Sequence, residues 1–150
     1  MPIILGGDCS VGHQAVKGLD CFEELDIIHF DSHLDWTKPL NGQPYFNGSP
    51  MRCNSTLPYV KNMIHLGIRG IGSSGPADFE EARANGDKIY SVKDYRRVGI
   101  EEILKNINLA VIHSFTSILM LWTIRSLKEL VLQCLVVLHM MKLLKCWSNR

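Results

Sequence analysis

Residues 110–150 contain no Asp, Gly, Pro or Tyr, although the chain as a whole has 12 Gly and 6 Pro. Turns between alternating helices and strands use these residue types, so their absence is unusual for a segment of a folded α/β domain. The same segment holds five of the 16 Lys and Arg residues and one of the 15 Asp and Glu residues. We therefore treat residues 1–109 as a partial domain and residues 110–150 as an atypical apolar and basic tail.

Other absences limit the class of protein. The chain has five cysteines but no CxxC pair, and their odd number fits a reducing compartment better than a disulfide framework. The net charge of +1 gives no electrostatic reason to expect nucleic-acid binding. No basic region precedes the short apolar run at the N-terminus, so we expect no signal peptide and predict a cytoplasmic protein.

Residues 1–109 alternate between short apolar runs and amphipathic segments. Such alternation predicts a parallel sheet with helices on both faces, that is, an α/β fold of three α-β-α layers, here incomplete. Ligands of these sheets bind at the carboxyl ends of the strands. The expected strands are 2–7, 25–31, 63–70 and 88–92, the expected helices are 11–19, 75–86 and 99–107, and 36–50 is expected to be a loop.

The tail allows three interpretations. Residues 126–145 place apolar side chains at helical spacing and predict an amphipathic helix that could bind a partner chain. The uncharged run 106–124 is barely long enough to span a bilayer, and Asn106, Asn108 and His113 interrupt it. We therefore do not expect a membrane span, and the third interpretation, a change of reading frame, is taken up below.

Asp31, His33 and Asp35 occupy alternate positions at the end of the apolar run Leu25–Phe30. Residues two apart on a strand face the same way, although Asp35 is expected to lie beyond the strand end. Two carboxylates and an imidazole suit manganese, iron or zinc, and aspartates left unpaired in a parallel sheet would be costly. We favour a divalent metal site over the alternative of a capping Asp, a loop His and a surface Asp, because Asp8 follows the neighbouring strand.

Four short motifs carry a resemblance to a known family. GGDCS at 6–10 and DSHLD at 31–35 resemble the Gly-Gly-Asp-His-Ser and Asp-Ala-His-x-Asp metal motifs of the arginase–agmatinase family, the ureohydrolases. NGSP at 47–50 resembles the substrate loop His-Gly-x-Pro, and HLGIRG at 65–70 resembles the strand after it. The resemblance covers about residues 1–109, and the agmatinase or guanidino-acid branch looks most similar.

This resemblance implies a chemistry and a set of site residues. The family uses two manganese ions to activate a water that hydrolyses a linear guanidine to an amine and urea. It implies a small guanidine substrate, polyamine metabolism for an agmatinase, and a homo-oligomeric assembly. By position in the motifs, the implied metal ligands are Asp31, His33, Asp35 and Cys9, with Asp31 and Asp35 catalytic, and the implied substrate-binding residues are Asn47, Gly48 and Ser49.

The chain departs from the family at several positions. Cys9 replaces a metal-binding His, and either a thiolate ligand or a small buried side chain fits this position. Asn47 replaces a His that shuttles protons, which an amide cannot do near neutral pH. Asp8 is expected to be an outer partner of the metal site or a structural residue. His13 and His65 are expected on a helix surface and in the core, respectively.

The family continues with an Asp-x-Asp-x-x-Asp strand, for which residues 110–150 offer no Asp. Codons read one base out of register force Asp at Trp122–Thr123 and Met140–Met141, and other codon choices can restore an aspartate strand and a Gly-Gly-Leu-Thr-Tyr segment. We therefore predict a frame shift near residues 109–113. The family's first strand and helix, which precede the first motif, are also expected to be absent. We expect little or no activity, because the fourth ligand, Cys9, is doubtful and the second aspartate pair is missing. The alternative is a non-catalytic metal-binding or partner-binding protein.

Overall fold

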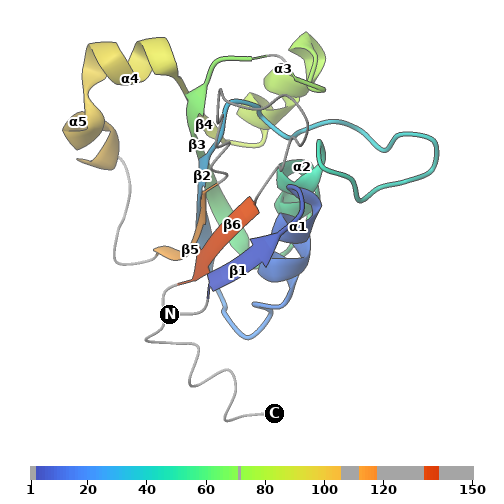
Figure 1. Ribbon diagram of the computed structural model, residues 1–150. Coiled ribbons are helices and arrows are strands. Elements are labelled where there is room, and N and C mark those ends of the chain that lie inside the picture. Colours follow the sequence, from blue (N-terminus) through green and yellow to red (C-terminus); the bar gives the residue numbers. More distant parts are fainter. Residues whose placement is uncertain (1–2, 71, 106–111, 118–133, 139–150) are drawn as a thin grey trace, which may run out of the picture.

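The computed structural model describes residues 3–70, 72–105, 112–117 and 134–138 (Figure 1). Helices and strands alternate along most of this length, as the sequence predicts. In chain order the elements are β1 Ile3–Gly6, α1 Ser10–Lys17, β2 Leu25–Phe30, α2 Pro50–Ser55, β3 Val60–Ile68, α3 Pro76–Ala84, β4 Lys88–Ser91, α4 Val92–Val98, α5 Ile100–Lys105, β5 Ile112–Ser117 and β6 Cys134–Leu138.

One sheet runs through the molecule in the order β1-β6-β5-β2-β3-β4. The strands β5, β2, β3 and β4 are parallel, whereas β6 pairs antiparallel with both β5 and β1. β2 lies between two parallel neighbours, so residues at its carboxyl end lie in the middle of the sheet edge. The expected α/β class is confirmed.

The helix expected over residues 126–145 is wrong where the structure describes that segment. Residues Cys134–Leu138 form the strand β6, and the rest of the expected helix lies outside the described residues. A continuous run of five apolar residues is compatible with either element, because periodicity alone does not separate a buried strand from a buried helix.

The two faces of the sheet pack against different helices. Leu25, Ile27 and Met63 share a buried cluster with side chains of α1, α2 and α3, whereas Ile28 and Ile64 share a second cluster with Ile103 of α5. In Figure 1, α1, α2 and α3 accordingly lie on the opposite side of the sheet from α5. Each fully buried aliphatic side chain contributes about 1.5–3 kcal/mol, so both faces stabilise the three-layer arrangement.

Two helices were not expected from the sequence. α2 begins with Pro50, a residue common in the first helical turn, and α4 begins at a capping box in which Ser91 and Asp94 bond each other's backbone N–H. Both start signals are visible in the sequence. Each helix has seven residues or fewer, too short to show a helical period clearly.

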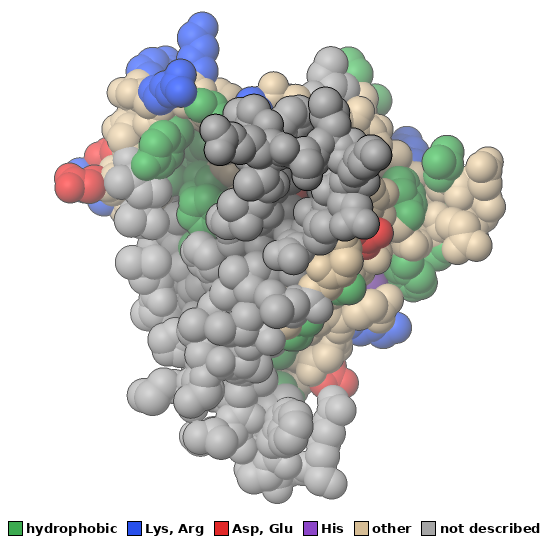
Figure 2. Space-filling model, viewed as in Figure 1, with side chains coloured by type: hydrophobic (Ala, Val, Ile, Leu, Met, Phe, Trp, Pro, Cys, Tyr) green, Lys and Arg blue, Asp and Glu red, His purple; other side chains and the backbone are tan. Residues whose placement is uncertain are grey.

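The described surface carries charges of both signs. Figure 2 shows basic side chains over α4, whose last turn holds Arg96 and Arg97, near acidic side chains of α5, whose first turn holds Glu101 and Glu102.

Among the described residues, no helix is long and apolar enough to cross a bilayer. The run 106–124 lies largely outside the described residues, and its described part, residues 112–117, is the strand β5.

Candidate metal centre

Three of the predicted ligands come together at the carboxyl end of β2. Cys9 lies between β1 and α1, Asp31 directly follows β2, and Asp35 lies in the loop beyond. One potential ligand atom from each residue lies within 4.8 Å of the others, and all three residues are buried. The cluster therefore joins the first and second sequence motifs at the sheet edge where α/β proteins bind ligands.

The fourth predicted ligand, His33, lies beside this group. Its Nδ1 atom is 3.9 Å from Asp31 Oδ1, and a third of its side chain is exposed. The ring lies close to Gly72, where a Cβ would be 2.7 Å from His33 Cδ2. Because β2 ends at Phe30, the alternation of a strand does not continue through residues 31–35, and the side chains there are directed by the loop.

The loop backbone at Asp35 is held by α2. Asp35 has φ +55°, a left-handed conformation that costs about 1–3 kcal/mol in a residue other than glycine. Its carbonyl oxygen accepts hydrogen bonds from the backbone N–H groups of Met51, at 3.1 Å, and Arg52, at 3.4 Å. These two N–H groups belong to the first turn of α2, where backbone donors have no partner within the helix. The carbonyl of the strained Asp35 therefore supplies the acceptor for them.

Burial shapes the charge of the two carboxylates. Burial raises the pKa of Asp35 to about 7, with the nearby His29 ring opposing and the Asp31 carboxylate adding to the shift. Burial also acts to raise the pKa of Asp31, but the His29 ring and the His33 backbone N–H outweigh it and hold that pKa below its usual value. Near pH 7, Asp31 is therefore ionised and Asp35 is close to half-protonated.

Several buried atoms at this site have no hydrogen-bond partner among the residues that the structure describes. They include Asp31 Oδ2, Asp35 Oδ2 and His29 Nε2. Buried polar atoms nearly always have hydrogen bonds, so a convergent set whose described contacts are only the longer ion-pair contacts of His29 Nε2 with Asp31 and Asp35 needs an explanation. A divalent cation fits this set of donors and would bind all of its atoms. The donors are two carboxylate oxygens, an imidazole nitrogen and the adjacent Cys9 sulfur.

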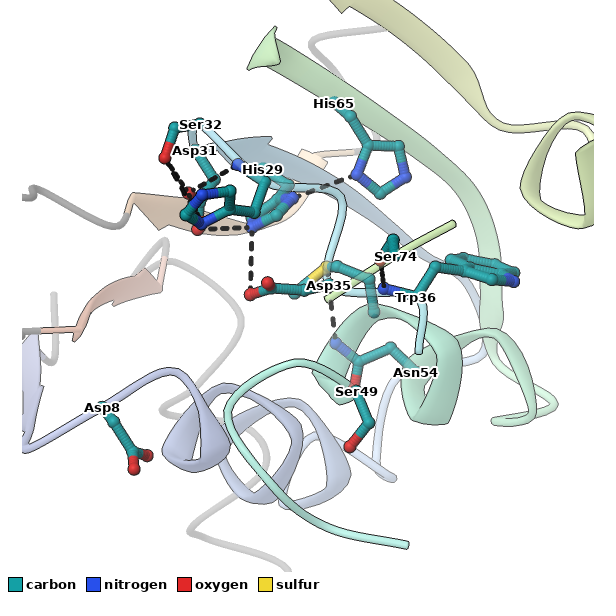
Figure 3. Close-up of polar contacts among 12 residues, drawn as sticks. Asp8, His29, Asp31, Ser32, Asp35, Trp36, Ser49, Asn54, His65 and Ser74 are labelled. Atoms are coloured by element: carbon teal, nitrogen blue, oxygen red, sulfur yellow. Dashed lines mark hydrogen bonds and ion pairs between the residues drawn. The ribbon is translucent and has the colours of Figure 1, made fainter. Parts of the chain in front are cut away.

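A buried hydrogen-bonded chain leads away from the cluster (Figure 3). His29 Nδ1 lies 3.0 Å from His65 Nδ1, and His65 Nε2 lies 2.8 Å from Asp87 Oδ2. Burial lowers the pKa of His65 although its hydrogen bond to Asp87 opposes the shift, so the ring is neutral near pH 7. The expectation that His65 is a core residue is confirmed, because it is fully buried.

Sequence reasoning missed the pairing of His65 with His29. A signal was present, because Ile28-His29-Phe30 and Ile64-His65-Leu66 are matching tripeptides on consecutive strands. β2 and β3 are parallel, and their register places His29 directly beside His65. Asp87 immediately precedes β4, the next strand of the sheet.

The predicted substrate residues lie at the end of the loop that leads into α2. Asn47 is exposed, whereas Gly48 and Ser49 are buried. The carbonyl of Gly48 accepts a hydrogen bond from Thr37 N at 2.9 Å, and the Ser49 hydroxyl donates to Pro44 O at 2.8 Å. Gly48 and Ser49 therefore shape the loop, and Asn47 is the residue of the three with an exposed side chain.

The structure agrees with the structural role expected for Asp8 but not with the position expected for His13. The Asp8 carboxylate accepts hydrogen bonds from the backbone N–H and the hydroxyl of Ser10, at the start of α1. These bonds give Asp8 the structural role, and Figure 3 shows it apart from the cluster. The expectation that His13 lies on a helix surface is wrong. Its Nδ1 lies 2.9 Å from Asn54 Oδ1, and its ring stacks on Tyr45, because α1 packs against α2 on that side.

Comparison with known proteins supports the sequence motifs. A curated arginase from Glycine max is 29% identical over 112 residues, covering 72% of this chain and 30% of the relative. An agmatinase from Bacillus subtilis is 33% identical over 86 residues, covering 57% of this chain and 29% of the relative. The chain thus spans about three-tenths of the length of these relatives, whose different names leave the branch of the family open.

Solved structures agree with the fold. Proclavaminate amidino hydrolase from Streptomyces clavuligerus has a TM-score of 0.62 and 25% identity, covering 68% of this chain and 35% of that one. The family described as "Arginase family" matches residues 1–119, ten residues beyond the expected boundary at 109. With most of its length matched in this way, the chain belongs to the arginase family of ureohydrolases.

Proposed function

We propose that the cluster of Cys9, Asp31 and Asp35 binds manganese, and that the parent reaction of this site is hydrolysis of a linear guanidine such as agmatine or a guanidino acid. The observation that carries the proposal is the convergence beside a thiol of buried carboxylate oxygens that have no hydrogen-bond partner among the described residues. Carboxylate donors suit manganese, and family membership supports hydrolytic chemistry.

In the proposed reaction, one water is consumed for each guanidine. The bond between the central carbon and the alkyl-bearing nitrogen breaks, the water oxygen becomes the urea carbonyl, and the leaving nitrogen takes a proton to give the amine. Bound divalent ions supply a water of lowered pKa at neutral pH and hold it against the substrate. Asp31 and Asp35 contribute the negative charge that retains the cations in this buried site.

The chain itself is proposed to turn over slowly or not at all. Asn47 cannot carry the proton to the leaving nitrogen near pH 7. Residues 110–150 provide no Asp for the family's second aspartate pair. Fewer anionic ligands bind a hydrated cation more weakly, because ligand number and charge offset the cost of dehydration.

The test combines metal binding with product formation on the full chain. Manganese binding is measured by calorimetry, and urea is assayed with agmatine, arginine and guanidino acids in turn. We expect binding that is lost in Asp31→Asn, with urea release that is slow or below detection. Fast urea release would contradict the expected low turnover, and the absence of metal binding would overturn the proposed site.

A non-catalytic metal-binding protein is the second candidate function. It is favoured by the loop hydrogen bonds of Gly48 and Ser49, which are both made within the loop region rather than toward the cluster. Stoichiometric manganese without urea from any guanidine tested would support this candidate over a slow hydrolase.

A further inference from the structure

One ring nitrogen of His29 is directed at the carboxylates of the metal cluster. Its Nε2 atom lies 3.4 Å from Asp31 Oδ2 and 4.0 Å from Asp35 Oδ2, and the side chain is fully buried. With metal–ligand bonds of about 2.1 Å, atoms that share one ion lie about 3–4.2 Å apart. Both distances fall in this range, although none of the three atoms has a hydrogen-bond partner.

The hydrogen bonds that link His29 to His65 and His65 to Asp87 assign the tautomer of His29. Asp87 also accepts a hydrogen bond from Asn85 Nδ2 at 2.8 Å, so its carboxylate acts as an acceptor on both oxygens. The N–H of His65 Nε2 then donates to Asp87, which leaves a lone pair on Nδ1 of a neutral His65 ring. That lone pair accepts from the Nδ1–H of His29, at 3.0 Å.

In the neutral ring that a metal ligand requires, His29 Nε2 carries a lone pair. A lone pair beside two carboxylate oxygens is repulsive in a buried site unless a cation lies between them. Figure 3 shows His29 between the carboxylates of Asp31 and Asp35 on one side and His65 on the other. A neutral imidazole held by an outer carboxylate is also the arrangement in which proteins present histidine to a metal ion.

We propose that His29 is a further nitrogen ligand of the metal site formed by Asp31 and Asp35, and that His65 and Asp87 are positioning residues that fix its tautomer. This inference rests on the proposed metal site and goes beyond the motif residues. It gives the site a borderline nitrogen donor although Cys9 stands at the position of the family's metal-binding His. The contrary arrangement has a protonated His29 paired with Asp31 and not bound to metal.

The test is pulsed electron paramagnetic resonance of the full chain loaded with Mn²⁺, read as ¹⁴N couplings to the ion. His33→Gln is the first variant, because His33 is a third exposed and its replacement removes the other predicted histidine ligand. We expect a ¹⁴N coupling to persist in His33→Gln and to be lost when His29→Gln is added. Absence of any ¹⁴N coupling in His33→Gln would overturn the inference without requiring a substitution in the core.

Manganese affinity provides a second readout. Asp87→Asn is expected to weaken binding roughly 10–100-fold, the range for loss of a ligand's outer partner, and His29→Gln is expected to weaken it at least as much. His13→Gln is the matched control, since His13 is also buried and hydrogen-bonded but contacts Asn54 and not the cluster. It should leave affinity and couplings unchanged, and circular dichroism checks that each variant is folded.

The outcomes separate the two proposals. If Mn²⁺ does not bind the wild-type chain, the proposed metal site fails and the inference fails with it. If Mn²⁺ binds and Asp31→Asn abolishes binding, but His29→Gln changes neither coupling nor affinity, the metal site stands and the role of His29 is overturned.

Discussion

At the residue scale, the site is governed by what burial does to individual polar groups. Asp31 and Asp35 lie four residues apart in the same loop, yet their pKa values shift in opposite directions. For Asp31, burial is outweighed by the His29 ring and by the backbone N–H of His33, which donates to Oδ1 at 3.0 Å, whereas for Asp35 burial outweighs the effect of the His29 ring. Neighbouring carboxylates thus hold different charge because their environments differ.

The raised pKa of Asp35 predicts a pH dependence of stability in the metal-free chain. The unfolded chain releases this proton near pH 4, and the folded chain retains it until about pH 7. The folded state therefore binds more protons between these values, so the free energy of unfolding falls by a few kcal/mol as pH rises from about 4 to about 7. Urea denaturation in the presence of a chelator, at pH 5 and pH 8, measures this fall.

Asp35→Asn is the control for that experiment, because it keeps the shape and removes the titration. Its stability should change less between pH 5 and pH 8 than that of the wild-type chain. Equal pH dependence in the two proteins would show that Asp35 titrates normally in the folded state.

Gly48 is predicted to be destabilised by an added side chain. A Cβ at this position would overlap Ser73 Oγ and lie 2.9 Å from Phe46 Cε2, so Gly48→Ala should destabilise the chain by about 1–3 kcal/mol. Gly7→Ala is the comparison, because no atom lies within 4 Å of a Cβ there, and its effect should stay within about 0.5 kcal/mol. Similar unfolding midpoints for the two variants would contradict the packing of this loop.

At the element scale, short helices depend on their caps. α4 has seven residues, none of which is buried, so packing contributes little to it. The Ser91 hydroxyl accepts a hydrogen bond from Asp94 N at 3.1 Å, and the Asp94 carboxylate accepts from Ser91 N at 3.1 Å. These reciprocal bonds satisfy donors that the first turn would otherwise leave exposed, and they define where β4 ends and α4 begins.

Ser91→Ala is predicted to cost about 1 kcal/mol, because it removes the cap while leaving the backbone in place. Ser91→Asp retains an oxygen acceptor and should restore most of the loss. Amide hydrogen exchange of α4 reports the change locally, and unchanged protection in Ser91→Ala would mean that other contacts hold the helix.

At the scale of the whole molecule, a ligand that binds the folded chain must stabilise it. Manganese at 100 times its dissociation constant is expected to add about 2.7 kcal/mol to the free energy of unfolding. Thermal unfolding with and without the metal measures the effect, and a chelator should reverse it. Asp31→Asn should show no shift in its unfolding temperature, so a shift of wild-type size in that variant would place the metal elsewhere.

The frame shift near residues 109–113 remains a prediction about the gene, and sequencing across codons 100–150 tests it. An insertion or deletion whose repair restores an aspartate strand would support it. A confirmed frame with codons that forbid the restored motifs would contradict it. The tail would then be a genuine part of the protein, and β5 and β6 would be its contribution to the sheet.

Much of the fold could be predicted from local signals. The strands β2, β3 and β4 and the helices α1, α3 and α5 follow from apolar runs and start signals, with boundaries shifted by a few residues. The strand β6 could not, because a short apolar run acquires its structure from the neighbours with which it pairs. The buried position of His13 likewise depends on α2, which is distant in sequence.

The sequence by itself determined the alternation of strands and helices, the metal motifs at 6–10 and 31–35, and the family. The tertiary structure decided which side chains surround the candidate metal site. His29 borders it because the register of β2 and β3 pairs it with His65, and Asp35 turns toward it because the first turn of α2 binds its carbonyl. Both relations join segments that are distant along the chain, so no local pattern contains them.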